Sequence, residues 1–311
     1  MNRENGTTPP PASICSRISV ASRALWAAAS ASGTGNLKSV TVASAGAVTQ
    51  DNGTRGSIAR THTGGTPLDT RVALVTGSAR RIGAAIARAL HAAGYDVALH
   101  CRTSVRERDA LAAELEARRP GSTLAMQADL AAFDRLPELV AQVVGRFGRL
   151  DALVNNASTF EPTPVGTTTP AQWDSLMASN ARAPFFLAQA AAPHLVASQG
   201  AIVNLVDVYA ERPLREHTVY CMAKAALLMM TRSLALELGP EVRVNAVSPG
   251  AILWPEENGD AEDRASMLAR TPLGRTGTPE EVAEAVRWLL QDAGYSTGQV
   301  LHLDGGRMLA G

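Results

Sequence analysis

Apolar and polar positions follow two alternating patterns from residue 71 onward. Short, continuously apolar runs are typical of strands buried on both faces of a parallel sheet. Between them lie longer stretches whose apolar positions recur every three or four residues, as in helices. The expected strands are 71–75, 96–99, 123–127, 150–154, 201–206, 242–247 and 300–303, and the expected helices are 84–93, 105–118, 135–146, 180–196, 219–238 and 280–290. This order predicts an α/β fold with a single doubly wound parallel sheet and helices on both faces.

Residues 1–66 follow neither pattern. They are rich in Ser, Thr, Ala and Gly and contain one aromatic residue, Trp26. Such a stretch buries too little apolar surface to offset the entropy lost on ordering. We therefore expect a disordered leader at 1–66 and one folded domain at 67–311. Two interpretations of the leader stay open: a targeting segment, because it is arginine-rich and poor in acids, or a start placed too far upstream.

Charge narrows the classes of partner. The chain of 311 residues carries 29 basic and 29 acidic side chains. The leader holds six of the basic and two of the acidic groups, which leaves 23 and 27 in residues 67–311, a net charge of −4. A body of this charge lacks the broad basic field of a nucleic-acid-binding protein. We find no apolar run of the roughly 18 residues that span a bilayer, so no membrane contact is expected.

Cysteine usage indicates a reducing compartment. Cys15, Cys101 and Cys221 are few, odd in number and widely spaced. A disulfide framework or a structural zinc site needs more cysteines at closer spacing. We expect a cytoplasmic protein with no metal site.

A phosphate-binding loop is predicted where the first strand turns into the first helix. The segment 76–83 reads TGSARRIG. Gly77 and Gly83 would let the backbone approach a pyrophosphate, and the helix N-terminus supplies N–H donors. Arg81 takes the place of the middle glycine, with Arg80 beside it, and such a pair suits phosphate charge. The alternative is an ordinary tight turn, but the strand–turn–helix context favours a dinucleotide.

The end of the second strand favours NADPH over NADH. An acid at this place would bind the ribose 2′-hydroxyl and repel a 2′-phosphate. The sequence instead has no acid in 100–104 and offers Arg102 and Ser104, which suit a phosphate. The alternative is that Arg102 caps a solvated loop.

A catalytic helix is predicted around Tyr220 and Lys224. The two residues are four apart, so they share one helix face, and Lys224 is the one lysine in residues 67–311. A lysine ammonium beside a phenol lowers the tyrosine pKa toward a useful range for proton donation. Asn180 opens a long predicted helix, and 155–158 reads NNAS after the fourth strand.

Taken together, these residues resemble the short-chain dehydrogenase/reductase family over roughly residues 70–311. The resemblance rests on TGSARRIG, Asp129, NNAS, Asn180, YCMAK at 220–224, SPG at 248–250 and the closing LDGG. It implies a Rossmann-type fold, Tyr220 as proton donor, Lys224 as the group that grips the nicotinamide ribose, and Asn180 as the holder of a water. Asp129 is similar to the family's acid beside the adenine. The implied cofactor-binding residues are Gly77, Arg80, Arg81, Ile82, Gly83, Arg102, Ser104, Asp129, Leu130, Asn156, Ala157, Ser158, Tyr220, Lys224, Pro249 and Gly250.

One departure from the family pattern narrows the substrate. Most members carry a serine thirteen residues before the tyrosine, where this chain has Asp207. A carboxylate would repel a developing alkoxide, but it suits a ring C=N whose nitrogen takes up a proton. In this respect the chain resembles the pteridine reductases, including bacterial dihydromonapterin reductase-like enzymes. That resemblance extends to Arg81 and to Phe160, whose ring would stack on a pterin.

The implied substrate-binding residues are Arg81, Ser158, Phe160, Asp207, Tyr220 and Trp254. We expect residues 251–270 to form a lid and His217 to lie at the surface. The family resemblance further implies a homotetramer, and Arg307 is a candidate for the C-terminal residue that relatives place in a neighbouring subunit's site. We therefore predict an NADPH-dependent pterin reductase. A generic carbonyl or 3-oxoacyl-thioester reductase and a non-catalytic NADPH-binding regulator are the alternatives.

Overall fold

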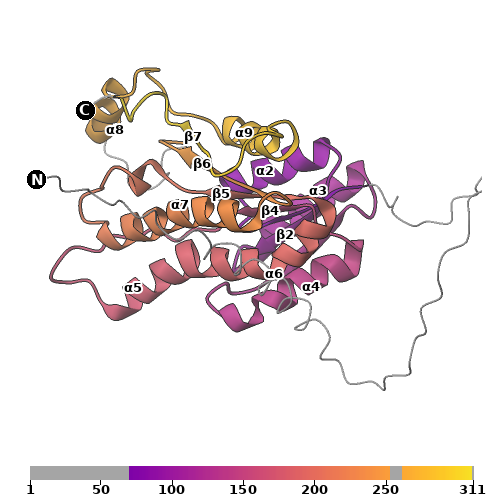
Figure 1. The fold of residues 1–311 in the computed structure, drawn as a ribbon. Helices are drawn as coiled ribbons and strands as arrows, with labels where there is room; N and C mark the ends of the chain where they lie inside the picture. The colour runs from indigo at the N-terminus through magenta and orange to yellow at the C-terminus, as the bar shows by residue number, and fades with distance from the viewer. Residues whose placement is uncertain (1–69, 253–260, 310–311) are drawn as a thin grey trace, which may run out of the picture. The chain divides into compact units, whose positions relative to one another are not determined.

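A parallel sheet forms the centre of the computed structural model, which describes residues 70–252 and 261–309 (Figure 1). The predictions for residues 1–66 and for Trp254 lie outside the described residues. The strands are β1 Val72–Val75, β2 Asp96–Cys101, β3 Thr123–Gln127, β4 Ala152–Asn155, β5 Ala201–Leu205, β6 Arg243–Pro249 and β7 Val300–Leu303. Within these residues they form one seven-stranded sheet in the order β3-β2-β1-β4-β5-β6-β7, and every pairing is parallel. The predicted fold class is confirmed.

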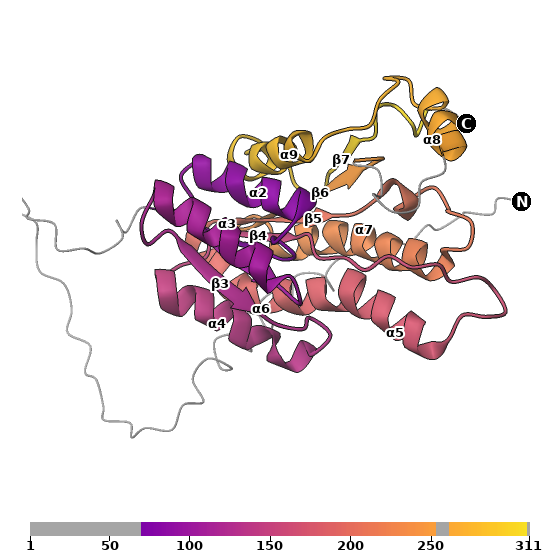
Figure 2. The ribbon, with the colours of Figure 1, turned by 180° about the vertical axis from the view of Figure 1, so that it is seen from behind.

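Two layers of helices cover the two faces of the sheet (Figures 1 and 2). One layer contains α2 Arg81–Ala92, α3 Val105–Arg118 and α9 Pro279–Gln291, and the other contains α4 Leu136–Phe147, α6 Ala183–Ser198 and α7 Thr218–Leu238. Within β1, Ala73 and Val75 belong to the first core, whereas Val72 and Leu74 belong to the second. Because successive side chains point to opposite faces, both faces of such a strand must be apolar. This explains the uninterrupted apolar runs in the sequence.

The chain order reverses between β1 and β4, which are neighbours in the sheet. The loops that follow these two strands lead away in opposite directions and leave a crevice at the carboxyl edge of the sheet. In open α/β sheets, ligands bind at this switch point. The loops after β1, β2, β4 and β5 carry most of the predicted site residues.

The structure contains two helices that the sequence pattern did not predict, α5 Pro170–Met177 and α8 Ala261–Ala269. Helix α5 begins with a capping box, in which Thr169 and Gln172 satisfy each other's backbone N–H groups. The TPAQ sequence at 169–172 was therefore an available signal. Asn180 does not open a helix as expected, because it lies in a π-helical turn, Ala178–Arg182, between α5 and α6.

Helix α7 is more apolar along its length than the sequence pattern led us to expect. Among the described residues, it is long and apolar enough, by length and composition, to cross a membrane. Half of its apolar window is buried inside the protein, and the helix carries the buried polar residues Tyr220 and Lys224. A core helix passes the same test, so the finding is weak evidence for a membrane span.

Candidate active site

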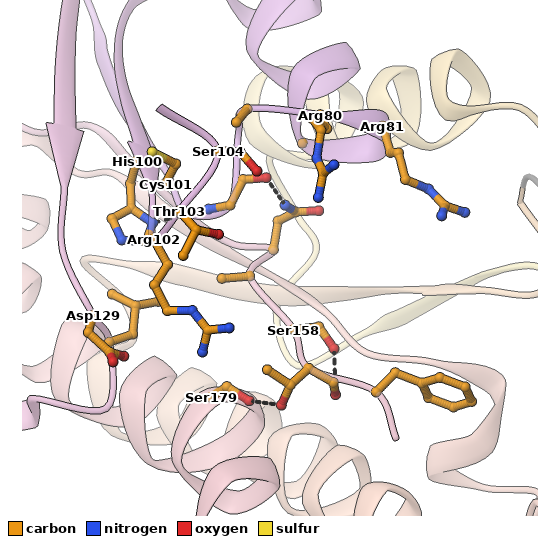
Figure 3. A pocket seen from close by; sticks show the side chains of 18 of the residues that line it. Arg80, Arg81, His100, Cys101, Arg102, Thr103, Ser104, Asp129, Ser158 and Ser179 are labelled. Atoms are coloured by element: carbon orange, nitrogen blue, oxygen red, sulfur yellow. Dashed lines mark hydrogen bonds between the residues drawn. The ribbon is translucent and has the colours of Figure 1, made fainter. Parts of the chain in front are cut away.

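The first of two large cavities lies at the carboxyl ends of β1, β2 and β4 and has a volume of about 710 Å³. Figure 3 shows it from close by. Its lining includes many of the predicted cofactor-binding residues, namely Gly77, Arg80, Arg81, Ile82, Gly83, Arg102, Ser104, Asp129, Leu130, Asn156, Ala157 and Ser158. The fold therefore brings together residues that are up to 81 positions apart in the chain, as the loop contact from Thr76 to Ala157 illustrates.

The glycine loop needs glycine at both ends. Gly77 has φ +62°, and a Cβ there would come within 2.9 Å of the Ala157 backbone. A Cβ on Gly83 would collide with the carbonyl of Gly77. Arg81 has φ 51°, in the left-handed region that disfavours a side chain. Helix α2 has no side-chain cap and no acid in its first turn, which leaves its N-terminus suited to an anion.

His100 connects the glycine loop to the end of β3. Its Nδ1 accepts a hydrogen bond from Gly77 N at 3.2 Å, and its Nε2 lies 3.1 Å from the carbonyl oxygen of Ala128. The two bonds together require a neutral ring with its proton on Nε2. Burial lowers the pKa of His100, which favours that neutral form. The sequence analysis missed this role, although a lone polar side chain at the end of a buried strand was a signal.

Thr76 and Asn156 connect the glycine loop to the loop after β4. Thr76 Oγ1 accepts hydrogen bonds from the backbone N–H groups of Asn156 and Ala157 at 2.9 and 3.0 Å. Asn156 Nδ2 donates to the carbonyl oxygens of Thr76 and Gly77 at 2.8 and 3.0 Å. The backbone of the phosphate loop is therefore held on two sides by neutral hydrogen bonds.

Three arginines lie around the phosphate loop, in the lining of the first cavity. Arg80, Arg81 and Arg102 are exposed, and Figure 3 shows Arg80 and Arg102 extending toward the cavity while Arg81 points to another side. Asp129 is also exposed, and its Oδ1 accepts a hydrogen bond from Ala131 N at 2.9 Å. The open helix terminus and the surrounding guanidinium groups fit a dinucleotide that carries phosphate charge.

The second cavity, of about 700 Å³, lies at the end of β5 and is lined by three of the four predicted catalytic residues, all except Asn180. It contains Asp207, Tyr220, Lys224, Pro249 and Gly250. The residues that line both cavities are Arg81, Ile82, Asn156, Ser158 and Phe160. A ligand in the first cavity can therefore meet a ligand in the second.

A buried polar group occupies the floor of the second cavity. The Tyr220 hydroxyl donates to Asp207 Oδ2 at 2.8 Å, while Asp207 Oδ1 accepts a hydrogen bond from Tyr209 N at 2.9 Å. Lys224 Nζ donates to the carbonyl oxygen of Leu205 at 2.9 Å, and the ammonium lies 5.7 Å from the centre of the Tyr220 ring. Tyr220 and Lys224 are 4% and 3% exposed, so their polar atoms act away from bulk water.

Burial sets the pKa values of this group. It lowers the pKa of Lys224 to about 8 and raises the pKa of Asp207 against the opposing effect of the Tyr209 N–H group. The pKa of Tyr220 is raised well above its usual value, first by burial and then by the negative charge of Asp207. The expectation that Lys224 lowers the tyrosine pKa was therefore wrong for this state of the protein. A protonated phenol at neutral pH is a proton donor.

Asn180 contacts the site through Ser158. Its Oδ1 accepts a hydrogen bond from Ser158 Oγ at 2.6 Å, and its Nδ2 donates to the carbonyl oxygens of Thr159 and Leu176 at 2.9 and 3.0 Å. Asn180 lines neither of the two cavities. In this structure it positions the loop after β4.

Phe160 closes one side of the second cavity. Its ring stacks on His217 with centroids 4.5 Å apart and planes 14° apart, and it meets the Tyr220 ring edge-on at 4.8 Å. His217, which we expected at the surface, is half-buried and lines the cavity. The aromatic neighbour of Phe160 was not predicted, because nothing in the sequence pairs residues 160 and 217.

Only part of the predicted lid, residues 251–270, lies within the described residues, and the lid stays a prediction. Ala251, Ile252 and Met267 line the second cavity, and α8 supplies Met267. Residues 253–260 lie outside the described part of the chain. Arg307 lines this cavity within its own chain.

The sequence is similar to those of known reductases. The family model described as enoyl-(acyl carrier protein) reductase matches residues 77–307. The chain is 39% identical over 279 residues to pteridine reductase 1 of Leishmania tarentolae, an alignment that covers 76% of this chain and 96% of that protein. It is 39% identical over 245 residues to the putative ketoacyl reductase 2 of the granaticin polyketide synthase of Streptomyces violaceoruber, with coverage of 76% and 96%. It is 34% identical over 241 residues to a 3-oxoacyl-(acyl-carrier-protein) reductase of Staphylococcus aureus, with coverage of 76% and 98%.

Proposed function

The chain belongs to the short-chain dehydrogenase/reductase family, an oxidoreductase family, and from that premise we propose that it catalyses the NADPH-dependent reduction of a pterin. The product would be a tetrahydropterin formed from a dihydropterin, and oxidised pterins or dihydrofolate are further possible substrates. Similarity to pteridine reductase 1 supports this choice. Similarity to ketoacyl reductase 2 is equal in percentage identity, at 39%, and similarity to the 3-oxoacyl-(acyl-carrier-protein) reductase is 34%. The choice between substrates therefore rests on the site.

The observation that carries the proposal is the Asp207 carboxyl group bonded to the Tyr220 hydroxyl at 2.8 Å. Reduction of a ketone develops negative charge on oxygen, which a carboxylate at this place would repel. Reduction of a ring C=N instead requires a proton at nitrogen, and the ring's amino N–H groups require an acceptor. A buried carboxyl group whose pKa is raised by desolvation can serve both needs.

The remaining residues have separable tasks. NADPH, when bound in the first cavity, supplies the hydride. Tyr220 holds a proton at its hydroxyl and passes it through the Asp207 contact, while the Lys224 ammonium stabilises negative charge on Asp207. Phe160 stacks on His217 and meets the Tyr220 ring edge-on, and these rings give the cavity an aromatic wall that suits a flat heterocycle.

The preference for NADPH over NADH is part of the same proposal. Arg102 and Ser104 lie at the end of β2 in the lining of the first cavity. A guanidinium and a hydroxyl bind a ribose 2′-phosphate, and neither repels it. The domain bounds of 67–311, a homotetramer and a cytoplasmic location stay predictions from the sequence and the family resemblance.

A carbonyl or 3-oxoacyl-thioester reductase is the second candidate. It is favoured by the similarity to ketoacyl reductase 2 and to the 3-oxoacyl-(acyl-carrier-protein) reductase. In such an enzyme Asp207 would be an eccentric replacement for the serine that most relatives carry.

The test follows NADPH absorbance with the full-length chain, offered a 7,8-dihydropterin or an acetoacetyl thioester. Asp207→Ser and the isosteric Asp207→Asn are assayed beside the unmodified enzyme. We expect pterin turnover that falls by roughly 100-fold or more in both variants, the usual scale of acid–base catalysis. Turnover of the thioester alone, with Asp207→Ser harmless or beneficial, would replace the pterin assignment with the second candidate.

A further inference from the structure

A third, smaller cavity of about 270 Å³ adjoins the substrate cavity. It is lined by Val208, Tyr209, Arg212, Pro213, Leu214, Arg270, Arg307 and Met308. Val208, Tyr209 and Arg307 also line the larger cavity that holds Asp207 and Tyr220. The smaller cavity therefore lies next to the place where the reducible part of a substrate would meet Tyr220.

Three segments of the chain each bring one arginine to this small cavity. Arg212 follows β5, Arg270 follows α8, and Arg307 comes from the C-terminal segment, which lies beside α8 in both views (Figures 1 and 2). The described residues that line the cavity include no carboxylate. A cavity lined by guanidinium groups suits an anion, which accepts charge-assisted hydrogen bonds from them.

Three carboxylates near the cavity, among the described residues, have other contacts. Asp304 accepts hydrogen bonds from the backbone N–H groups of Gly306 and Met308 at 2.9 and 2.7 Å. Glu211 lies 3.2 Å from His302. Asp207 faces the neighbouring cavity, and the charge of Arg307 is among the causes that lower its pKa against the larger effect of burial. The positive charge of Arg307 therefore reaches the catalytic carboxyl group.

Arg307 is held in position while its donors stay open to a ligand. Its carbonyl oxygen accepts a hydrogen bond from Arg212 Nη1 at 3.1 Å, which anchors the segment. Its own Nη2 lies 3.5 Å from the Tyr209 hydroxyl, and the guanidinium lies 5.9 Å from the centre of that ring. A guanidinium has five N–H donors in a planar fork that matches a carboxylate or a phosphate. A weak contact at 3.5 Å leaves most of that capacity for an anion.

We propose that this arginine-lined cavity binds the anionic end of the substrate, so that the enzyme prefers substrates whose reducible part is joined to a carboxylate or phosphate tail. The inference rests on the proposed function for its pterin form, since the cavity shares Val208, Tyr209 and Arg307 with the proposed pterin site. Arg307 would contact the anion directly, Arg270 would contribute at the rim, and Arg212 would act by positioning Arg307.

The test compares charged and neutral tails on the same reducible group, using the full-length chain. Dihydrofolate, which carries carboxylates, is paired with 7,8-dihydrobiopterin, which carries none. Acetoacetyl-coenzyme A, which carries phosphates, is paired with the neutral N-acetylcysteamine thioester. The ratio of kcat/KM within each pair reports the tail, whereas the choice between pairs reports the proposed function. Failure of the pterin assignment therefore leaves this proposal testable on the thioesters.

The matched variants are Arg307→Gln, Arg307→Lys and the control Arg118→Gln, whose arginine is exposed on α3. We expect Arg307→Gln to lower the charged-to-neutral ratio by about tenfold or more, mainly through KM, as expected for a lost charge-assisted bond. Arg307→Lys should retain part of the ratio, Arg118→Gln should retain all of it, and added salt should lower it in the unmodified enzyme. The charged-to-neutral ratio of kcat/KM is compared between the carboxylate pair and the phosphate pair, and the larger ratio shows which anion the cavity prefers.

An unmodified enzyme with no preference for charged tails, or a preference that Arg307→Gln leaves intact, would overturn the proposal. If neither pair is turned over, calorimetric dissociation constants for dihydrofolate and dihydrobiopterin supply the same ratio. Equal constants would then overturn it, and a ratio that depends on Arg307 would support it.

Discussion

The cofactor side and the substrate side of the site are built from different kinds of contact. Around the first cavity, neutral hydrogen bonds of His100, Thr76 and Asn156 fix the backbone, and the charged groups are exposed arginines. Around the second, Asp207, Tyr220 and Lys224 have ionisable groups inside the protein, and burial shifts all three pKa values. Exposed arginine side chains can adjust to the phosphates of a charged cofactor. Proton transfer instead depends on groups whose pKa values are shifted because they are buried away from water.

The difference between the two sides implies separable effects of substitution. Changes on the substrate side should alter kcat, because they remove interactions used in the chemical step. Changes on the cofactor side should alter binding and selectivity for the cofactor.

The largest effect is expected from Tyr220→Phe, which removes the proton donor and keeps the ring. We expect kcat to fall by roughly 1,000-fold, within the usual range for loss of a general acid. NADPH absorbance gives the rate, and fluorescence titration gives the NADPH dissociation constant. Tyr295→Phe, at a fully exposed tyrosine, is the matched control. A loss of NADPH affinity as large as the loss of kcat would show that the two sides are not separable.

A smaller effect is expected from Arg102→Glu on the cofactor side. Reversal of this charge replaces attraction with repulsion at the expected 2′-phosphate. The preference for NADPH over NADH, measured as a ratio of kcat/KM values, should fall by roughly 10- to 100-fold. Arg118→Glu makes the same change at an exposed position on α3 and should leave the ratio unaltered. An unchanged ratio in Arg102→Glu would assign Arg102 to solvent rather than to phosphate.

The smallest effect is expected at His100, where the neutral ring connects Gly77 to Ala128. His100→Leu should weaken NADPH binding by about tenfold, the scale of one or two lost hydrogen bonds. His100→Gln keeps a donor and an acceptor and should restore part of the affinity. Calorimetric titration with NADPH measures both variants.

The same histidine predicts a pH dependence of stability. Burial lowers the pKa of both His100 and His91 in the folded protein, so the unfolded chain takes up protons first as the pH falls. The stabilisation is complete above the ordinary histidine pKa of about 6.5 and is lost below it, by up to about 1.4 kcal/mol per pH unit for one group. Urea unfolding between neutral and mildly acidic pH should show this slope, and His100→Leu should reduce it. His91→Gln should also reduce the slope but leave NADPH affinity unchanged. Equal slopes with and without His100 would mean that its pKa is the same in the folded and unfolded protein.

The sequence predicted the fold well because both sheet faces are buried. The bounds of α3, β3 and β7 agree with the predicted ranges, although β3 and β7 are the edge strands and are only partly buried. Helices α5 and α8 were missed, because each is short and lies outside the two main layers. Asn180 was placed at a helix start because a π-helical turn leaves no mark in apolar periodicity.

The candidate site was predicted in its members but not in its electrostatics. The loops after parallel strands meet at one edge, so the predicted cofactor residues had to gather. The direction of the Tyr220 pKa depends on burial and on its distance to Asp207, and neither is written in the spacing of residues. The stacking of Phe160 on His217 is likewise a tertiary contact between distant loops.

The single lysine of residues 67–311 makes the substrate side open to amine chemistry. Lys224 is buried, and every other basic side chain in that part of the sequence is an arginine or a histidine. With a pKa of about 8, an appreciable fraction of its amine is uncharged at neutral pH, so access limits its reaction with an acylating reagent more than protonation does. The rate of acylation of Lys224, measured by mass spectrometry, would therefore report how often the structure around this residue opens to solvent. No engineered label is needed for that measurement.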